Sequence, residues 1–190
     1  PATATHDAYL KYPGTDDATW FGYSVSQAGD VNNDGYDDVM VGGPLSDYDV
    51  GSNRGAAFVY YGSSTMGSTS TYNVYLKYPG TDDTTRFGWS VSQAGDVNAD
   101  GYDDVVVGAY LSSYDTGSGR GAAFVYYGSS TTDSTSTYNV YLKYPGTDDS
   151  AGLGYSVAQA DDVNGDGYGD IIVGAALSDF GGVTNKGAAF

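Results

Sequence analysis

The stretch that decides the fold is Lys-Tyr-Pro-Gly-Thr-Asp-Asp, which occurs without change at Lys11–Asp17, Lys77–Asp83 and Lys143–Asp149. Both intervals are 66 residues long, and the tetrapeptide Gly-Ala-Ala-Phe recurs three times at the same interval. A fixed period of this length indicates tandem copies of one structural unit. The chain of 190 residues therefore contains three copies of that unit, the last one incomplete.

Four segments of each unit have the pattern of β-strands. In the first copy we predict strands at Tyr23–Ala28, Asp38–Gly43, Gly55–Gly62 and Tyr72–Tyr78. The second segment is centred on an apolar run, which suits a strand buried on both faces. Alternation in the fourth predicts one face made of Tyr72, Val74, Leu76 and Tyr78. The Ser/Thr-rich stretches Ser63–Thr71 and Ser129–Thr137 are predicted to be loops.

The predicted fold class is all-β, with three four-stranded antiparallel propeller blades. Residues 1–13 match the end of a unit and are expected to be the fourth strand of a preceding or partner blade. Residues 14–79 form blade 1, 80–145 blade 2, and 146–190 a partial blade 3. Propellers usually close with about 4–8 blades. We therefore expect either a longer array, or a homo-oligomer in which a terminal strand of the same or another chain completes the last blade.

The composition supports strands and turns and excludes several kinds of partner. The formal net charge is −17, and all 24 acidic residues are Asp, a poor helix former that favours turns. This charge disfavours nucleic acid and anionic membranes as partners, because no basic patch is available. Zero Cys excludes disulfides and thiolate metal sites. No apolar run approaches the roughly 18–20 residues of a membrane span, so no membrane insertion is expected.

The strongest chemical signal is an acidic loop that begins at Asp30, Asp96 and Asp162. Side-chain oxygens stand at positions 1, 3, 5 and 9, Gly at position 6 allows a sharp turn, and position 7 can offer its carbonyl, which is how a short loop binds calcium. Position 12 carries Val and not the Glu of an EF-hand, so the loop must join two strands. The predicted ligands of three Ca²⁺ sites, one per repeat, are Asp30, Asn32, Asp34, Tyr36, Asp38, Asp96, Asn98, Asp100, Tyr102, Asp104, Asp162, Asn164, Asp166, Tyr168 and Asp170.

The alternative interpretation of these loops is an ordinary hairpin turn, which Asp and Gly also favour. Against it, the four oxygen side chains are present in all three copies. The intervening positions 4 and 8 vary among Asn, Ala, Gly and Asp. Selective retention of the oxygen donors favours calcium.

The combined motif resembles the FG-GAP repeat. Phe21-Gly22 and Phe87-Gly88 precede the acidic loop, and Val41-Gly42-Gly43-Pro44 follows it, with related Val-Gly-Ala segments in the other copies. Leu153-Gly154 replaces Phe-Gly in the third copy, and only the first copy has the Pro. FG-GAP repeats build the β-propeller of integrin α subunits and occur in many bacterial surface proteins. The resemblance implies a calcium loop between the first two strands of each blade.

Two weaker signals have structural explanations. Asp16-Asp17 and its copies Asp82-Asp83 and Asp148-Asp149 are expected to be solvated turn residues and not a second cation site. Arg54, Arg120 and Lys186 precede Gly-Ala-Ala and are expected to make local ion pairs with Asp.

The expected function is that of an extracellular calcium-binding module with a structural or adhesive role, secreted or at the cell surface. A protein or glycan ligand is possible. The alternative function is that of a carbohydrate-binding lectin, in which some of the 20 Tyr side chains stack on sugars. Otherwise the Tyr rings pack blade against blade. An enzyme fits poorly, because the one His, His6, lies outside the repeated core and no nucleophile elbow or phosphate loop is present.

Overall fold

The computed structural model describes residues 8–48, 52–69, 71–114, 117–131, 137–179 and 184–190. The described residues form three antiparallel sheets, each with its strands in sequence order. The first contains β1 (Ser24–Gly29), β2 (Asp38–Gly43), β3 (Ala56–Tyr60) and β4 (Val74–Lys77). The second contains β5 (Ser90–Gly95), β6 (Asp104–Ala109), β7 (Ala122–Tyr126) and β8 (Val140–Lys143). The third contains β9 (Leu153–Asp161), β10 (Asp170–Ala175) and β11 (Ala188–Ala189).

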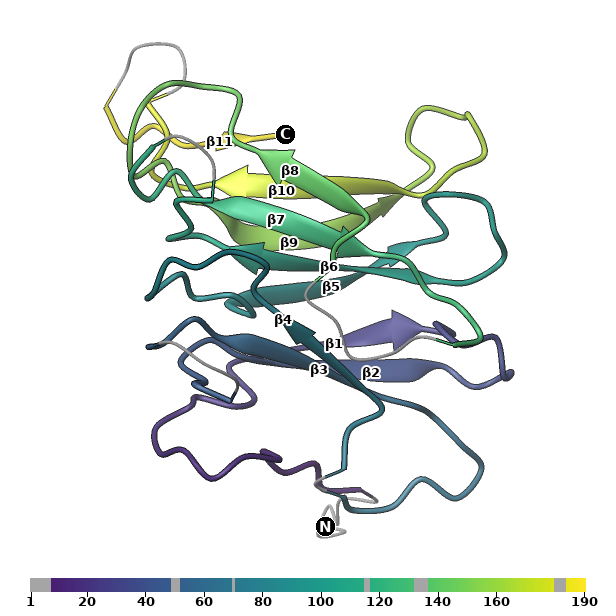
Figure 1. The fold of residues 1–190 in the computed structure, drawn as a ribbon. Helices are drawn as coiled ribbons and strands as arrows, with labels where there is room; N and C mark the ends of the chain where they lie inside the picture. The colour runs from purple at the N-terminus through teal and green to yellow at the C-terminus, as the bar shows by residue number, and fades with distance from the viewer. Residues whose placement is uncertain (1–7, 49–51, 70, 115–116, 132–136, 180–183) are drawn as a thin grey trace, which may run out of the picture.

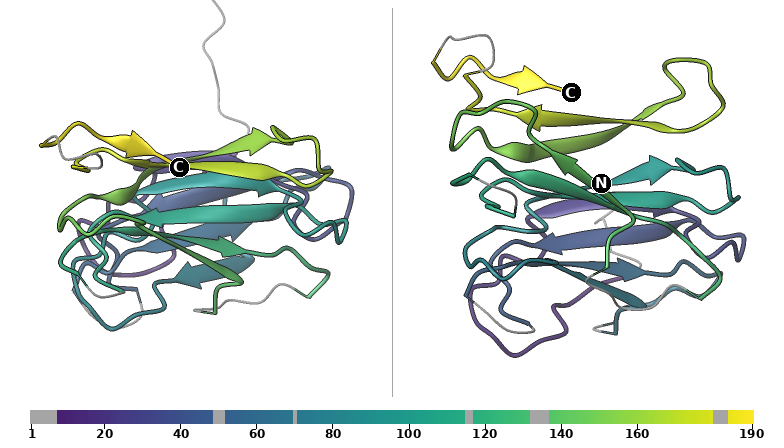
Figure 2. Two further views of the ribbon diagram at one scale, coloured as in Figure 1. Left: turned by 90° about the horizontal axis from the view of Figure 1, so that it is seen from above. Right: turned by 45° about the horizontal axis from the view of Figure 1, so that its top comes forward.

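The sheets are stacked face to face in sequence order, with the first and third sheets at opposite ends of the stack (Figure 1, and from two further directions in Figure 2). This arrangement confirms the predicted fold class: all-β, with sheets of four, four and three antiparallel strands that match three propeller blades. Among the described residues, no helix is long and apolar enough to cross a membrane.

The predicted strand bounds agree with the observed ones to within two residues, and β2 agrees at both ends. One predicted face is wrong in part. Val74, Leu76 and Tyr78 belong to one core cluster, but Tyr72 packs with Phe58 in the cluster on the other side of the sheet. Because β4 begins only at Val74, the two-residue alternation of a strand does not extend back to Tyr72.

The sheets pack closely because glycines lie where two backbones meet. A Cβ on Gly108 of β6 would stand 2.1 Å from the carbonyl oxygen of Gly154, which belongs to the next sheet. Gly42 meets Gly88 in the same way at the first junction. These glycines are part of the Phe-Gly and Val-Gly segments of the repeat, so the motif encodes the spacing of the blades.

Tyr78, at the end of β4, anchors the junction between the first two blades. Its ring centroid lies 6.3 Å from that of Phe87 and 5.8 Å from that of Phe124, both in the second blade. Its hydroxyl donates to Asp82 Oδ1 at 2.7 Å and bonds to Ser112 Oγ at 2.7 Å. Tyr rings thus pack blade against blade, and a satisfied hydroxyl makes this burial tolerable.

The described part of the leading segment, residues 8–13, makes equivalent contacts with the first blade. Tyr12 packs edge-on against Phe58 and bonds to Asp16 and Ser46. Leu10 forms a single parallel bridge with Thr69, in the loop after β3. Tyr12 therefore contacts the first blade in the same way as Tyr78, which follows β4, contacts the second, although residues 8–13 do not form a regular strand.

The two blade junctions differ in how well they are filled. Between the first two blades the residual space is about 10 Å³, enclosed by side chains that include Val59, Leu76 and Tyr126. Beside the third blade, Leu142, Leu153, Ile171 and Phe190 line a hollow of about 280 Å³. The difference arises because the third sheet ends with the two-residue β11 and has no fourth strand among the described residues.

Candidate metal centres

The three acidic loops connect β1 to β2, β5 to β6 and β9 to β10, and they leave the sheets on the same side of the stack (Figure 1). In the first loop the ladder between β1 and β2 is interrupted by a bulge between Gln27 and Gly29. Gly29 adopts a positive φ of 71°, which a glycine reaches without strain. The bulge changes the direction of the chain, and Asp30 becomes the first residue of the loop.

The side chains of the first loop fold back onto its own backbone. The two carboxylate oxygens of Asp30 accept the N–H groups of Asp34 and Gly35, at 2.9 and 2.8 Å. Asn32 Oδ1 accepts Asp34 N–H at 3.0 Å, and Asn32 Nδ2 donates to Asp34 Oδ2 at 3.0 Å. Positions 1, 3 and 5 of the loop are therefore held together by its local hydrogen bonds.

Asp38 closes the loop from inside the protein. Its side chain is fully buried, with Oδ2 accepting Val31 N–H at 3.0 Å and Oδ1 accepting Gly62 N–H at 2.8 Å. Burial, and to a smaller extent the negative charges of Asp34 and Asp30, raise the pKa of Asp38 to about 6, although the two backbone hydrogen bonds act to lower it. The three carboxyl groups are thus close enough to repel one another.

The second loop repeats this arrangement almost without change. Asp96 accepts the N–H groups of Asp100 and Gly101, at 3.0 and 2.9 Å. Asp104 is fully buried, accepts Val97 N–H and Gly128 N–H at 2.9 Å each, and has its pKa raised by burial to about 6.

The third loop keeps the local pattern but lacks the enclosure. Asp162 accepts Asp166 N–H and Gly167 N–H at 3.0 and 2.9 Å. Asp170 is only half-buried, and it accepts Val163 N–H at 3.0 Å and Asn164 Nδ2 at 3.3 Å. In the other two loops the second oxygen of the closing carboxyl accepts the N–H of Gly62 or Gly128, which follow the third strand, whereas in this loop it accepts from Asn164 of the loop itself.

Two positions of the loop require a left-handed backbone. Position 6 is Gly in all three copies, with φ near 90°, as the sharp turn demands. Position 4 also has positive φ, 56° at Asn33, 58° at Ala99 and 77° at Gly165. Asn and Gly tolerate this conformation, whereas Ala at this position is strained. The variation at position 4 therefore has a conformational cost that the sequence pattern alone does not show.

Position 8 has a role that the sequence pattern did not predict. Asp103 Oδ2 accepts the backbone N–H of Asp30 at 2.9 Å, so the second loop holds the first residue of the first loop. The equivalent residue of the third loop is Gly169, whose backbone N–H donates to Asp96 O at 3.1 Å. The sequence offered one signal for this contact: two of the three loops carry Asp at position 8, which is not a predicted ligand position.

The oxygen donors of each loop fit a hard cation, although in this structure their side chains are not arranged around a single point. Among the described residues, no group of three or more Asp or His side chains lies at the spacing of a formed metal site. However, each loop offers oxygen atoms only, from carboxylate, amide and carbonyl groups, and calcium prefers such ligands. Asp38 and Asp104 are buried carboxyls, and neither belongs to an ion pair found among the described residues. A bound cation would neutralise their ionised forms.

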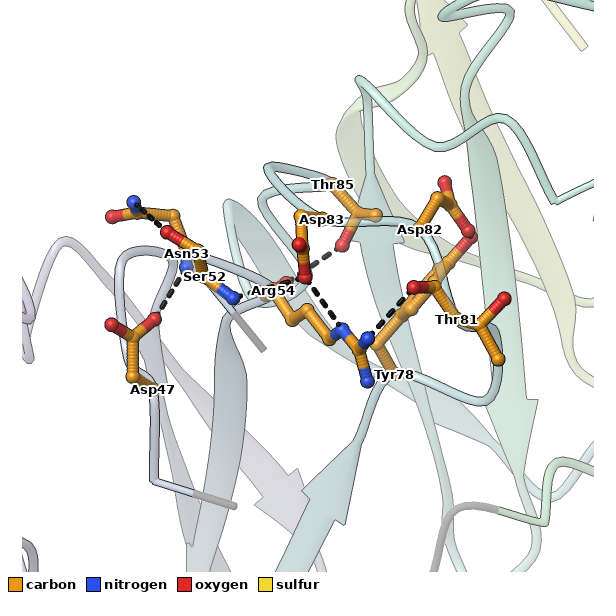
Figure 3. A network of polar contacts seen from close by, with 9 residues as sticks. All are labelled: Asp47, Ser52, Asn53, Arg54, Tyr78, Thr81, Asp82, Asp83 and Thr85. Atoms are coloured by element: carbon orange, nitrogen blue, oxygen red, sulfur yellow. Dashed lines mark hydrogen bonds and ion pairs between the residues drawn. The ribbon is translucent and has the colours of Figure 1, made fainter. Parts of the chain in front are cut away.

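The Asp-Asp pairs that follow Pro-Gly-Thr are not simply solvated turn residues, which corrects the expectation from the sequence. Asp82 accepts the Tyr78 hydroxyl and, at 2.9 Å, the backbone N–H of Ser113. Asp83 accepts the backbone N–H of Ser52 and pairs with Arg54, whose Nε lies 3.0 Å from Oδ1 (Figure 3). These carboxylates connect the first blade to the second because Ser52 and Arg54 belong to the first.

The same connection recurs at the second junction, where Arg120 Nε lies 3.2 Å from Asp149 Oδ1. Arg54 and Arg120 thus form ion pairs with Asp as predicted, but the pairs are not local, because each Asp lies 29 residues away in the next blade. His6, which the sequence analysis placed outside the repeated core, lies outside the described residues.

Comparison with known proteins agrees with the repeat seen in the fold. The FG-GAP repeat family matches three segments, residues 21–60, 87–126 and 153–190. Each match begins at the first strand of a blade or just before it and runs to the third, so it contains the whole acidic loop. The chain belongs to the FG-GAP repeat family.

Several integrin α subunits are similar to the chain. Integrin alpha-5 of Xenopus laevis is 33% identical over 169 residues, covering 86% of this chain and 15% of the relative. Integrin alpha-IIb of Mus musculus is 36% identical over 160 residues, with 83% and 15% covered. Integrin alpha-6 of Homo sapiens is 35% identical over 164 residues, with 85% and 13% covered. The chain is thus homologous to a propeller region and spans about 15% of the length of these relatives.

Proposed function

We propose that this chain is a calcium-stabilised propeller module with a structural or adhesive role, located outside the cell. The observation that carries the proposal is the threefold recurrence of an all-oxygen loop whose closing carboxyl, Asp38 or Asp104, is buried in two of the three copies. Without a cation the negative charge of such a loop is not neutralised, and its carboxylates repel one another. The repeats resemble non-enzymatic scaffolds, and the proposal assigns no catalytic step to any residue.

In each loop the ligands would come from positions 1, 3, 5, 7 and 9. Asp30, Asn32 and Asp34 offer side-chain oxygens, Tyr36 offers its carbonyl, and Asp38 offers the closing carboxylate. The corresponding residues serve in the second and third copies. Calcium would neutralise the clustered carboxylates and tie the turn to the first two strands of its blade.

The extracellular location follows from the kind of site. Modules of this type bind calcium with Kd on the order of 10⁻⁴–10⁻³ M, and such loops fill only where free calcium is high. The three loops would then be occupied outside the cell and empty in the cytosol.

Thermal unfolding with and without calcium tests the metal assignment. If each site is filled at ten times its Kd, calcium stabilises the fold by about 1.4 kcal/mol per site. We expect a lower melting temperature in EGTA than in calcium at fixed ionic strength, and magnesium should restore less of the difference. A melting temperature that is the same in EGTA and in calcium would show that the loops are ordinary turns.

The outer surfaces of the first and third blades are proposed to pack against further blades, from the same array or from a second copy. Val25 of β1 is 68% exposed, and with Leu10 and Val39 it borders an open apolar hollow of about 380 Å³. At the other end, Ile172 of β10 is 45% exposed, on the face of the strand opposite to Ile171 and Val173, which line the hollow at the third blade. Exposed apolar surface of this kind is normally covered by a partner.

The mass in solution, measured by light scattering with and without calcium, tests whether copies supply the missing contacts. A closed ring predicts one defined oligomer, and an open array predicts a concentration-dependent series. A strict monomer under both conditions would leave only neighbouring blades of a longer chain as partners.

A further inference from the structure

The third acidic loop contains a pair of residues that the other two loops lack. Asn164 is followed by Gly165, and no other Asn in the sequence precedes Gly. At the same position 3, the first loop has Asn32 followed by Asn, and the second has Asn98 followed by Ala. The side-chain amide of Asn can be attacked by the backbone nitrogen of the next residue, most readily when that residue is Gly, because no Cβ crowds the nitrogen. The pair is therefore a candidate modification site.

Hydrogen bonds in the third loop polarise both groups that such a reaction would join. Asn164 Oδ1 accepts the backbone N–H of Asp166 at 2.9 Å, which draws electrons from the side-chain carbonyl carbon, Cγ. Gly165 N–H donates to Asp162 Oδ1 at 2.7 Å, and a negatively charged acceptor increases the electron density on the donor nitrogen. The first of these bonds is present in all three loops. The second is found, among the described residues, in the third loop only.

The third loop is also the most exposed of the three. Asn164 is exposed, whereas Asn32 and Asn98 are half-buried. Val163, just before Asn164, is 73% exposed, but the equivalent Val31 of the first loop is only 3% exposed. Few buried contacts therefore oppose the small backbone movement that brings the attacking nitrogen within bonding distance of Cγ in the third loop.

We propose that Asn164 is a deamidation site, which reacts with Gly165 while the third loop is free of calcium. The backbone nitrogen of Gly165 loses its proton to hydroxide and forms a bond to Asn164 Cγ, giving a cyclic succinimide. The bond between Cγ and Nδ2 breaks, and Nδ2 takes a proton from water and leaves as ammonia, which regenerates the hydroxide. A further water molecule opens the ring at either carbonyl, so that aspartate or isoaspartate stands at position 164.

Calcium would prevent this attack, and this part of the inference rests on the metal site proposed above. Asn164 offers its side-chain oxygen as the ligand at position 3, so a bound ion would hold this side chain and stabilise one conformation of the loop. The nitrogen of Gly165 would then reach Cγ only after the ion had left. The closing carboxylate Asp170 is the least enclosed of the three, so the third loop is expected to lose its ion first.

The two products change the third site in opposite directions. Aspartate at position 3 adds a negatively charged ligand and favours tighter binding, because calcium affinity depends on the charge of the ligands. Isoaspartate inserts a methylene group into the backbone between positions 3 and 4, which displaces the later ligands and weakens binding. Calcium-free periods would therefore alter one site of the chain irreversibly and leave the first two unchanged.

Incubation of the whole chain in EGTA, followed by peptide mapping with tandem mass spectrometry, tests the proposal. Conversion of amide to acid is measured at Asn164, Asn32 and Asn98 in the same sample, so the first two loops are internal controls. We expect Asn164 to convert at least about tenfold faster than either control. Calcium at about ten times the Kd of the third site leaves roughly a tenth of the loops empty, so the conversion rate of Asn164 should fall about tenfold.

Two reciprocal substitutions separate the effect of the Asn-Gly pair from that of its surroundings. Gly165→Ala gives the third loop the Asn-Ala pair of the second, and a Cβ there would meet no heavy atom beyond the neighbouring residues within 4 Å. This variant should slow the conversion of Asn164 about tenfold. Ala99→Gly creates an Asn-Gly pair in the more enclosed second loop. Asn98 should then convert faster than in the unaltered chain but more slowly than Asn164. Thermal unfolding checks that both variants are folded.

The proposal is wrong if Asn164 keeps its amide in EGTA as long as the two controls do, or if Gly165→Ala converts as fast as the unaltered chain. It is also wrong if Asn98 in Ala99→Gly converts as fast as Asn164. Calcium that binds the third site by calorimetry without slowing the conversion would overturn it too, and would leave the metal proposal intact. Absence of calcium binding would instead contradict the metal proposal, and the comparison within the chain in EGTA would still decide whether Asn164 is a deamidation site.

Discussion

The loops that begin at Asp30 and Asp162 carry the same donors at positions 1, 3, 5 and 9 but have different surroundings. In the first, Asp38 is fully buried and accepts the N–H of Gly62, which follows β3. In the third, Asp170 is half-buried and accepts from Asn164 of its own loop. The hydrogen bonds among positions 1, 3 and 5 therefore form within the loop, whereas the enclosure of the closing carboxylate at position 9 depends on residues that follow the third strand.

The largest expected effect is a pH dependence confined to the enclosed loops. Burial raises the pKa of Asp38 and of Asp104 from 3.8 to about 6 in the calcium-free protein. Folding then takes up protons at these carboxyls, so stability falls as the pH rises from about 4 to about 6, by about 3 kcal/mol for each group. Saturating calcium should reverse the trend, because it binds only the ionised form.

Carboxyl NMR titration in EGTA measures these two pKa values, and urea unfolding across the same pH range measures their effect on stability. Asp162 should behave in the opposite sense, because hydrogen bonds from the backbone N–H groups of its loop lower its pKa. Ordinary pKa values at Asp38 and Asp104 would contradict the prediction.

The second prediction compares one substitution in the two environments. Asp104→Asn places an amide donor against the backbone N–H of Val97 or Gly128, in a site without solvent, and should cost about 2 kcal/mol. Asp170→Asn should cost less than about 1 kcal/mol, because its partners are more exposed and water can replace them. Both are measured by urea unfolding in EGTA at about pH 4, below the raised pKa of Asp104, so that removal of an ionised carboxylate does not offset the loss. Equal losses would show that enclosure does not distinguish the loops.

The third prediction concerns the contact between neighbouring loops. Asp103→Ala removes the acceptor for Asp30 N–H and should cost about 1 kcal/mol. It gives the first loop the environment of the second, which faces Gly169 and has no such carboxylate. Hydrogen exchange of the Asp30 amide should rise in this variant, and an unchanged exchange rate would remove Asp103 from the account.

The smallest predicted effect comes from position 4. Ala99→Gly should stabilise the calcium-free chain by about 0.5–1 kcal/mol, because Ala99 adopts φ of 58°. Gly165→Ala, in the third loop, should have the reverse effect of similar size. Thermal unfolding measures both, and two changes of the same sign would contradict the left-handed assignment.

The sequence predicts the repeating parts of the structure well. A period of 66 residues, apolar runs such as Val39–Val41 and the Gly-Ala-Ala-Phe segments indicate four strands per unit, and the structure confirms them in the first two blades. The same pattern places the loop residues between the first and second strands. These features depend on local propensity and alternation, which a single sequence contains.

The features that involve two blades could not be predicted. An Asp partner was predicted for Arg54, but not that it would be Asp83 of the next blade. The contact from Asp103 to Asp30 and the ring contact between Tyr23 and Trp89 also join residues far apart in the chain. Nothing in the local pattern of Asp82 or Asp83 distinguishes a solvated turn from a junction between blades. The burial of Asp38 and Asp104 likewise depends on Gly62 and Gly128, which the loop pattern does not include.

Calcium titration of the chain, followed by calorimetry, tests the central claim most directly. We predict three bound calcium ions per chain, with the site at Asp162 weaker than those at Asp30 and Asp96 because its closing carboxylate is less enclosed. Asp100→Ala should remove one of the two tighter sites and leave the weaker one. The absence of calcium binding at millimolar concentrations would contradict the account, as would three sites that Asp100→Ala leaves unchanged.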